Sequence, residues 1–242
     1  MKFARNKKGQ FIVIAVLMIA LMIIALSVTI FSMGTYYKQE QWEEYMTLIE
    51  HVKLNTVDVV DISLAAYTED LNNTSIMKDN LNRWQNDLGK AHPGHGIILT
   101  YELADDIVQA YGTSIDYDQG LARQWNESSS FSAANTTITL NITSIGLEGY
   151  RFVITSFLNL TILSVDPSSK VINATVFRED GVPVTELEKE NFQVEDVSIS
   201  NVTSYYDPQH MLVYTIRCDD LELSNATLTV WDQRGIKVIA KT

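Results

Sequence analysis

The N-terminal part of the chain begins with a long apolar run. No charged residue occurs from Gln10 to Tyr37, and residues 11–31 are almost wholly apolar. As an α-helix, a run of that length spans about 30 Å, which matches the hydrocarbon core of a bilayer. The pattern therefore predicts a transmembrane helix over residues 10–35.

An amphipathic pattern follows the apolar run. Between residues 38 and 70, apolar residues recur with a period of about 3.6, and acidic residues such as Asp58 and Asp61 lie off that stripe. The pattern predicts a helix that continues straight out of the membrane. Its acidic residues are expected to form its solvent-exposed face.

A second, shorter helical stripe comes next. Its apolar residues are Met77, Leu81, Trp84 and Leu88. Gly89 and Pro93 are expected to end this helix. Residues 36–92 together are thus predicted to form a helical stalk.

The period then changes from helical to extended. Residues 97–103 alternate between apolar and polar, and residues 137–143 and 150–163 are rich in Thr, Ile and Val. Residues 104–134 are mixed and polar, and their pattern is weak. The chain is therefore predicted to have a β-rich region over residues 97–165.

The clearest linker is Asp166-Pro167-Ser168-Ser169, and a compact β-rich segment follows it. The strands expected in this segment are residues 170–178, 192–199, 211–217, 225–231 and 236–241. Short strands at regular spacing, separated by turn residues, predict an immunoglobulin-like β-sandwich over residues 170–242. The predicted fold class is α+β, with a transmembrane helix, a helical stalk, a β-rich region and this C-terminal sandwich.

The distribution of charge predicts an orientation. Residues 1–9 carry four basic and no acidic side chains, whereas the remainder carries 14 basic and 30 acidic ones. The positive-inside rule places residues 1–9 as a basic cytoplasmic tail and residues from about 36 onward outside the cell membrane. A cleaved signal sequence and a buried core helix are the alternatives.

Charge and cysteine content also restrict the partners. The lipid bilayer is the expected partner, with self-association through the N-terminal helix, and an acidic surface would repel nucleic acid. Cys218 is the only cysteine, so an intramolecular disulfide and a thiol-based metal site are excluded.

Sequons for N-glycosylation are frequent beyond the apolar run. Nine of the 15 asparagines open an Asn-x-Ser/Thr sequon, although 39 Ser and Thr residues in 242 would give about two or three by chance. The predicted glycosylation sites are Asn72, Asn73, Asn126, Asn135, Asn141, Asn159, Asn173, Asn201 and Asn225. Asn141 and Asn159 each lie between apolar residues, so a strand would turn them away from the core. The alternative is that Asn, Ser and Thr simply abound on polar sheet faces.

Signatures of catalysis are missing from the sequence. It contains no Gly-x-Ser-x-Gly elbow, no phosphate-binding Gly-rich loop and no His-Glu-x-x-His helix. His92 and His95 have a spacing that zinc sites use, but Pro93-Gly94 makes a turn the simpler account. Asp116 and Asp118 lack the full spacing of a calcium loop. We therefore predict a protein that is not an enzyme and has no catalytic residue, cofactor or metal.

Two resemblances concern the source and role of the chain. The segment Lys7-Lys8-Gly9-Gln10-Phe11 before a long apolar helix resembles the processing region of archaeal type IV pilin-like proteins. The resemblance implies that a membrane peptidase cuts after Gly9 and that the freed helices pack as a filament core. Ile14 stands where many pilins place an acidic residue.

The second resemblance spans most of the chain. The segments that carry it are Gly9-Gln10-Phe11, His92-Pro93-x-x-Gly96, Gly181-x-Pro183-Val184 and Asp232-Gln233-Arg234-Gly235-Ile236-x-Val238. Together they are similar to a group of uncharacterised archaeal membrane-anchored surface proteins, which implies location and architecture only. The Gly-x-Pro-Val segment and the closing strand also resemble immunoglobulin-like modules of surface adhesins.

Three functional hypotheses follow. The first is a membrane-anchored, N-glycosylated extracellular surface protein with a structural or adhesive role, in its sharper form a pilin-like subunit. The second is a receptor-like ectodomain that binds a ligand or polymer for a transport or sensing complex, with a pocket between the helical part and the first β region. An extracytoplasmic enzyme such as a hydrolase ranks last.

Overall fold

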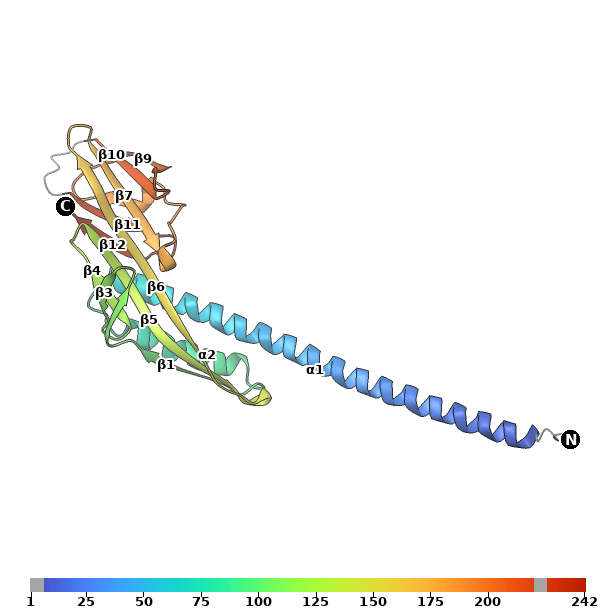
Figure 1. Cartoon of the computed structure of the whole chain (residues 1–242). Coiled ribbons are helices and arrows are strands. Elements are labelled where there is room, and N and C mark those ends of the chain that lie inside the picture. The colour runs from blue at the N-terminus through green and yellow to red at the C-terminus, as the bar shows by residue number, and fades with distance from the viewer. Residues whose placement is uncertain (1–6, 220–225) are drawn as a thin grey trace. The chain divides into compact units, whose positions relative to one another are not determined.

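A computed structural model describes residues 7–219 and 226–242 of the chain (Figure 1). It divides into two compact units, Met1–Leu54 and Asn55–Thr242. Helix α1, Lys7–Glu69, passes from the first unit into the second without interruption. The described part of the first unit is therefore entirely helical, and the second unit contains the end of α1 with all other elements.

Helix α1 confirms the prediction that the helix over the apolar run continues to about residue 70. Helix α2, Ile76–Ala91, also forms as expected, with Met77, Leu81 and Leu88 buried. Gly89 lies inside α2, so the prediction that it ends the helix is wrong. The helix ends shortly before Pro93, which disfavours helical geometry in the residue before it.

Side chains of the second unit join the end of α1 to α2. Val60 and Leu64 are fully buried. The Nε1 of Trp84 donates to the Oγ1 of Thr56 over 3.0 Å. The Nδ2 of Asn80 donates to the Oγ of Ser63, also over 3.0 Å. The buried hydroxyls of Thr56 and Ser63 on α1 thereby gain partners, so burying them costs little free energy of folding.

A seven-stranded antiparallel sheet dominates the second unit. Its strands follow the order β1-β5-β6-β7-β10-β9, and β4 pairs with β5. The bounds are β1 Ile97–Leu103, β4 Leu121–Gln124, β5 Ser129–Ile142, β6 Leu147–Asp166, β7 Val171–Arg178, β9 Ile199–Tyr206 and β10 Leu212–Cys218. Two smaller sheets complete the unit, with the order β12-β11-β8 and β2-β3. Their bounds are β2 Ile107–Ala110, β3 Thr113–Asp116, β8 Phe192–Val194, β11 Thr227–Trp231 and β12 Lys237–Lys241.

The two long strands β5 and β6 run through the middle of this sheet (Figure 1). Successive side chains of a strand point to opposite faces, and here one face is apolar. Its fully buried residues include Ile138, Leu140, Ile142, Leu158 and Leu160. Most alternate residues of the same strands, such as Thr137 and Thr139, are polar and half-buried, which defines an inner face and an outer face of the sheet. On this outer face Phe131, Ala133 and Phe157 are the exception, because they are buried in a smaller apolar cluster with Ile115, Tyr117 and Ala122.

The three-stranded sheet packs against the large one. Strand β12 contacts both β5 and β6. The ring of Phe192 in β8 lies 5.3 Å from that of Tyr214 in β10, centroid to centroid. The Oγ of Ser132 in β5 donates to the carbonyl oxygen of Lys237 in β12 over 2.6 Å. The second unit is thus layered, with apolar side chains between the sheets.

The predicted linker at residues 166–169 is a hairpin turn within this sheet. The Oδ1 of Asp166 accepts hydrogen bonds from the backbone amides of Ser168 and Ser169. Strands β6 and β7 on either side of the turn pair with each other. The β-rich region and the C-terminal segment therefore share one sheet across the boundary we expected, and an immunoglobulin-like sandwich over residues 170–242 is not confirmed.

Individual strands match the sequence pattern unequally. The α+β class and the strands around residues 97–103, 137–143 and 150–163 are confirmed. The expected strand at 192–199 is wrong, because β8 ends at Val194 and β9 begins at Ile199. Between them Asp196 adopts a positive φ of 58°, which turns the chain into the other sheet.

Candidate functional site

The apolar segment of α1 is the most exposed apolar surface among the described residues. Residues Val13–Met33 have a mean hydropathy of 3.0, and none of that segment is buried in the structure. Such a helix is long and apolar enough to cross a bilayer, and a signal sequence has the same properties. The structure is thus compatible with the predicted single span, and its orientation stays a prediction.

The predicted glycosylation sites differ in exposure. Asn72, Asn126 and Asn201 are exposed. The half-buried sites are Asn73, Asn135, Asn141, Asn159 and Asn173, and Asn225 lies outside the described residues. As the period-2 pattern predicted, Asn141 and Asn159 are half-buried while their apolar neighbours in the chain are fully buried.

Hydrogen bonds separate these asparagines further. The Nδ2 of Asn159 donates to the carbonyl oxygen of Ser130 over 3.1 Å, and the Nδ2 of Asn173 donates to the Oγ of Ser164 over 3.0 Å. An oligosaccharide attached to this nitrogen replaces one of its two hydrogens. Asn159 uses both hydrogens, for Ser129 and Ser130, so attachment there would break a hydrogen bond of the sheet. The three exposed sites are therefore the most accessible acceptors.

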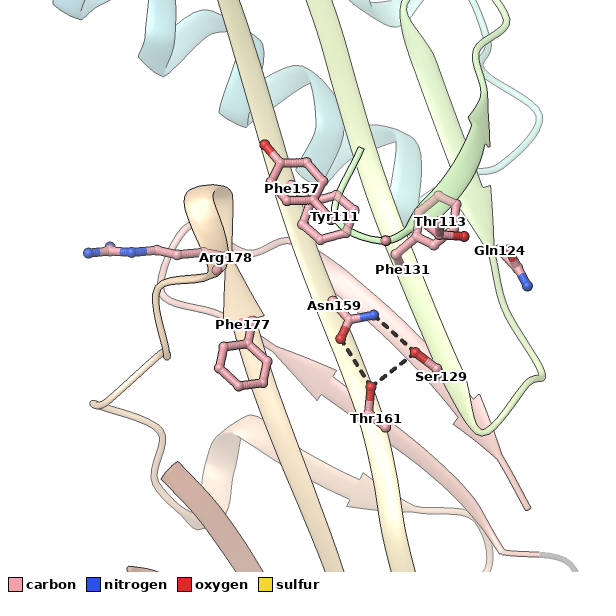
Figure 2. Close-up of a pocket in the computed structure, with 12 residues that line it drawn as sticks. Tyr111, Thr113, Gln124, Ser129, Phe131, Phe157, Asn159, Thr161, Phe177 and Arg178 are labelled. Atoms are coloured by element: carbon pink, nitrogen blue, oxygen red, sulfur yellow. Dashed lines mark hydrogen bonds between the residues drawn. The ribbon is translucent and has the colours of Figure 1, made fainter. Parts of the chain in front are cut away.

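A cleft of about 570 Å³ opens on the outer face of the large sheet. Twelve residues line it, from the β2–β3 hairpin, from β4 to β7, and from the short 3-10 helix η2, Glu179–Gly181 (Figure 2). They are Tyr111, Gly112, Thr113, Gln124, Ser129, Phe131, Phe157, Asn159, Thr161, Phe177, Arg178 and Gly181. The receptor hypothesis expected a pocket between the helical part and the first β region, so this cleft lies elsewhere.

Strand register explains the floor of the cleft. Phe131, Asn159 and Phe177 stand opposite one another on β5, β6 and β7, which gives a row of ring, amide and ring. Two residues along each strand, a second row consists of Ser129, Thr161 and Thr175, of which Ser129 and Thr161 line the cleft and Thr175 is buried. Period-2 alternation puts both rows on the same face. The cleft therefore presents aromatic side chains beside a row of hydroxyls.

The polar groups of the floor form one hydrogen-bonded network. The Oγ of Ser129 and the Oγ1 of Thr161 lie 3.0 Å apart. Thr161 donates to the Oδ1 of Asn159 over 3.1 Å, and the Nδ2 of Asn159 approaches Ser129 at 3.4 Å (Figure 2). Each hydroxyl can both donate and accept, so the network fixes the side chains and keeps capacity for a ligand.

A tight hairpin turn between β2 and β3 positions the ring of Tyr111 at the side of the cleft. Tyr111 and Gly112 form the two-residue loop between β2 and β3, with φ of 54° and 76°. Positive φ at both positions is the signature of a type I′ turn, and it is unusual for a residue as bulky as tyrosine. The ring of Tyr111 stacks on that of Phe157 at 4.1 Å and an interplanar angle of 20°. Burial raises the pKa of Tyr111, and the nearby charges of Asp180 and Glu179 add to that rise.

A cluster of charged side chains around Arg234 contacts β6 at Phe157, the residue on which Tyr111 stacks. The guanidinium of Arg234 lies 2.6 Å from Glu179, 2.6 Å from Asp232 and 3.4 Å from Asp61, each measured nitrogen to oxygen. It also donates to the carbonyl oxygen of Phe157 over 3.1 Å. Burial alone would lower the pKa of Arg234, but the three carboxylates together raise it. The cluster thus holds β6 in place at the residue beneath Tyr111.

Asp61 in this cluster corrects a prediction. We expected the acids of the amphipathic helix to be solvent-exposed, but the Asp61 side chain is only 16% exposed. Burial is the main cause that raises its pKa, against the lowering effects of a hydrogen bond to Ser156 and of the charge of Arg234. The helical stripe could not identify this contact, because its partner lies 173 residues away in the chain.

The sequence did not identify the cleft. Residues 104–134 have a weak pattern, and they contribute Tyr111, Gln124 and Phe131 to it. The available signal is the Tyr111-Gly112 pair, since Gly favours a two-residue hairpin turn.

The histidines considered as metal ligands pack against each other. The rings of His92 and His95 lie edge to face with centroids 5.8 Å apart. No group of three or more metal-ligating side chains occurs in the part of the chain that the structure describes.

The comparisons with known proteins add no relative. No protein-family model, no curated protein and no solved structure matches this chain. The functional argument therefore depends on the apolar helix, the sequons and the cleft.

Proposed function

We propose that this chain is a membrane-anchored surface protein with a structural or adhesive role. One observation carries the proposal: a single helix combines an exposed apolar segment, Val13–Met33, with final turns that are built into the β-rich unit. An exposed apolar surface of this length is costly in water and favourable in lipid. A continuous helix would connect the anchor directly to the folded unit.

The proposed location is the cell membrane, with a cytoplasmic N-terminus and an extracellular C-terminus. The basic residues of positions 1–9 precede the apolar segment, and acidic residues follow it. This asymmetry supports the orientation through the positive-inside rule. The sequons support it as well, because all nine lie beyond the apolar segment and three are exposed in the structure.

The sharper form of the proposal is a pilin-like subunit. Cleavage after Gly9, as the resemblance to archaeal pilin-like proteins implies, would leave helix α1 continuous from Gln10 to Glu69. The lipid-facing segments of several copies would then associate with each other. We also propose an immunoglobulin-like arrangement of the C-terminal strands, and the contact between Phe192 and Tyr214 across two sheets supports it.

A receptor-like ectodomain is the alternative. The cleft beside Tyr111 favours it, since aromatic walls with a few converging polar groups are typical of ligand sites. Both roles use the same anchor. They differ in whether the N-terminal helix is processed and in whether the cleft is occupied.

Mass spectrometry of the protein from native membranes tests the anchor and its processing together. The intact mass gives the N-terminal residue, and peptide mapping gives the occupancy of each sequon. We expect a chain that retains Val13–Met33 and carries glycans at Asn72, Asn126 or Asn201. A start at Gln10 would support the pilin-like form. A matched variant, Gly9→Leu, should then remain uncut and still be found in the membrane.

Other outcomes separate the alternatives. A full-length chain with glycans would favour the receptor-like form and contradict pilin-type processing. A chain that begins after Met33 would mean that the apolar segment is a signal sequence, and the membrane anchor would be refuted. Nine bare sequons would refute glycosylation.

A further inference from the structure

We propose that the cleft on the outer face of the large sheet binds a neutral carbohydrate, with a sugar ring against Tyr111 and Phe177 and its hydroxyls on the polar floor. The inference goes beyond the anchoring role and does not depend on it. It follows from three properties of the cleft: accessible rings, a network of uncharged polar groups, and the scarcity of charge.

The aromatic side chains offer a rigid platform. Tyr111 is 40% exposed and Phe177 is half-buried, so both rings remain accessible. Behind Tyr111, the rings of Phe157 and Phe131 are almost fully buried and stack on each other at 5.7 Å. The C–H face of a pyranose packs on such rings through dispersion. A ring already fixed by its neighbours loses little conformational entropy when a ligand binds.

The polar floor suits hydroxyl groups. Asn159, Ser129 and Thr161 are linked to each other over 3.0 to 3.4 Å, and in Figure 2 they lie below Tyr111 and to the right of Phe177. Hydroxyls on both sides can donate and accept, so a sugar can join this network without leaving a donor unpaired. The donors of these three side chains are already paired, so the floor offers free acceptor lone pairs to the hydroxyls of a ligand, and an apolar ligand would leave those lone pairs unused.

The low charge of the cleft disfavours anionic and cationic ligands. Of the twelve described residues that line the cleft, Arg178 alone carries a charge, and its guanidinium points away from Asn159 in Figure 2. Glu179 and Asp180 act on Tyr111 from outside this lining, and Glu179 is paired with Arg234. A phosphate ligand would need basic groups, and a cation would need carboxylates, within reach of the floor. The volume of about 570 Å³ lies within the range of small-molecule sites.

A carbohydrate at this position could come from two sources. One is a glycan of another molecule. The other is a glycan of the chain itself, since Asn159 on the floor opens a sequon with Thr161. The hydrogen bond from the Nδ2 of Asn159 to Ser130 favours the first source, because attachment would disturb it.

The test uses the full chain, produced in a host without N-glycosylation. The detergent should be an amine oxide, since maltoside and glucoside detergents are themselves carbohydrates. Neutral trisaccharides of glucose, mannose, galactose and N-acetylglucosamine are titrated to about 10 mM, with saturation-transfer NMR as the readout. We expect at least one to bind with a Kd of roughly 0.1 to 1 mM.

A variant at the turn separates binding from folding. Tyr111→Asn keeps the positive φ and gives the Asn-Gly pair that type I′ turns prefer, but it removes the ring. We expect affinity to fall at least about tenfold, the size of one lost stacking contact. Tyr206→Asn is the matched control, because Tyr206 is 60% exposed on β9 and does not line the cleft. Its affinity should equal that of the wild type.

Two results would overturn the proposal. One is that the unglycosylated chain binds none of the four sugars. The other is that Tyr111→Asn and Phe177→Ala both bind as tightly as the wild type. Protein from the native source distinguishes the two sources of sugar. If its own glycan fills the cleft, it will bind added sugar only after Asn159→Gln, whereas an open cleft will bind without that change.

Discussion

The two segments of helix α1 show how one helix can be suited to two solvents. Residues Val13–Met33 are almost wholly apolar and exposed throughout the structure, and the hydroxyls of Ser27, Thr29 and Ser32 donate to carbonyl oxygens of the same helix. In the final segment, residues 55–69, apolar residues such as Val60 and Leu64 are buried beside polar ones such as Ser63. The first segment has no polar face to present to water, and the second has a partner for each buried hydroxyl.

The exposed fraction of an apolar side chain does not by itself identify its partner. Ile24 in the first segment and Ile62 in the second are 59% and 60% exposed, so their exposed fractions are nearly equal. Their surroundings in sequence differ, because Ile24 lies in an uncharged run and Ile62 follows Asp61. Only the first segment can transfer as a whole into hydrocarbon.

Charges introduced into the apolar segment should therefore reduce membrane insertion, whereas charges introduced further along α1 should not, and this is the largest effect we expect. Leu21→Asp with Ile24→Asp should raise the free energy of membrane insertion by about 6 to 8 kcal/mol, since each exchange costs about 3 to 4 kcal/mol near the centre of a span. The fraction of the protein that remains in alkali-washed membranes should fall sharply.

The control for this prediction places the same charges elsewhere on α1. Leu54→Asp with Ile62→Asp changes residues that are 62% and 60% exposed, and it should leave the membrane fraction unchanged. If the Leu21 and Ile24 variant stayed in the membrane like the wild type, the segment would not be the anchor. If both variants were lost equally, the effect would come from helix folding.

Loss of Arg234 should produce the second-largest effect. Arg234→Met keeps the length of the side chain but leaves Asp61, Glu179 and Asp232 partly buried without a cation. Removal of one partner from a buried ion pair costs about 3 to 5 kcal/mol, so the midpoint of urea unfolding should fall strongly.

Arg151 provides the exposed counterpart. It lies 2.5 Å from Glu102, with both side chains more than half exposed. Arg151→Met should lower the free energy of unfolding by no more than about 1 kcal/mol, as surface pairs usually do. If Arg234→Met and Arg151→Met lowered the free energy of unfolding equally, the Arg234 cluster would not stabilise the contact between α1 and the sheet.

Local periodicity explains which parts of the fold were predictable. The stripes of α1 and α2 and the alternation in β5 and β6 depend on neighbours a few residues apart, and those elements are confirmed. The four-residue strands β2, β3 and β4 are too short to show a period. The sequence at Asp166 predicts a linker where the structure has a turn, because Pro and Ser are typical both of tight turns and of connections between domains.

Long-range pairing explains what could not be predicted of the cleft. In the sequence Asn159 is recognisable only as a sequon, since nothing near it indicates that Phe131 and Phe177 flank it on neighbouring strands. The register of three strands makes the site, and register is set by contacts far apart in the chain. The Arg234 cluster depends in the same way on residues from four separate elements or turns.

A buried hydroxyl on α1 gives a smaller test. Thr56→Val preserves shape but removes the acceptor of the Trp84 Nε1, so unfolding should become easier by about 1 to 3 kcal/mol. Thr47→Val is the control, because its exposed hydroxyl only returns a hydrogen bond to the carbonyl oxygen of Glu43. That variant should stay within about 0.5 kcal/mol of the wild type. A fully tolerated Thr56→Val would show that Trp84 finds water instead.

The smallest expected effect concerns pH and Asp61. Because burial raises the pKa of Asp61 above its ordinary value, the native state binds this proton more tightly than the unfolded state. At neutral pH the charged form is therefore a net cost, and Asp61→Asn should be neutral or stabilising by less than about 1 kcal/mol. As pH falls through the raised pKa, the wild type should gain stability relative to Asp61→Asn, and urea unfolding at several pH values measures that difference. If the wild type instead lost stability relative to Asp61→Asn as pH falls, Arg234 would hold Asp61 in its charged form. Asp61 would then be a stabilising ion-pair partner of Arg234.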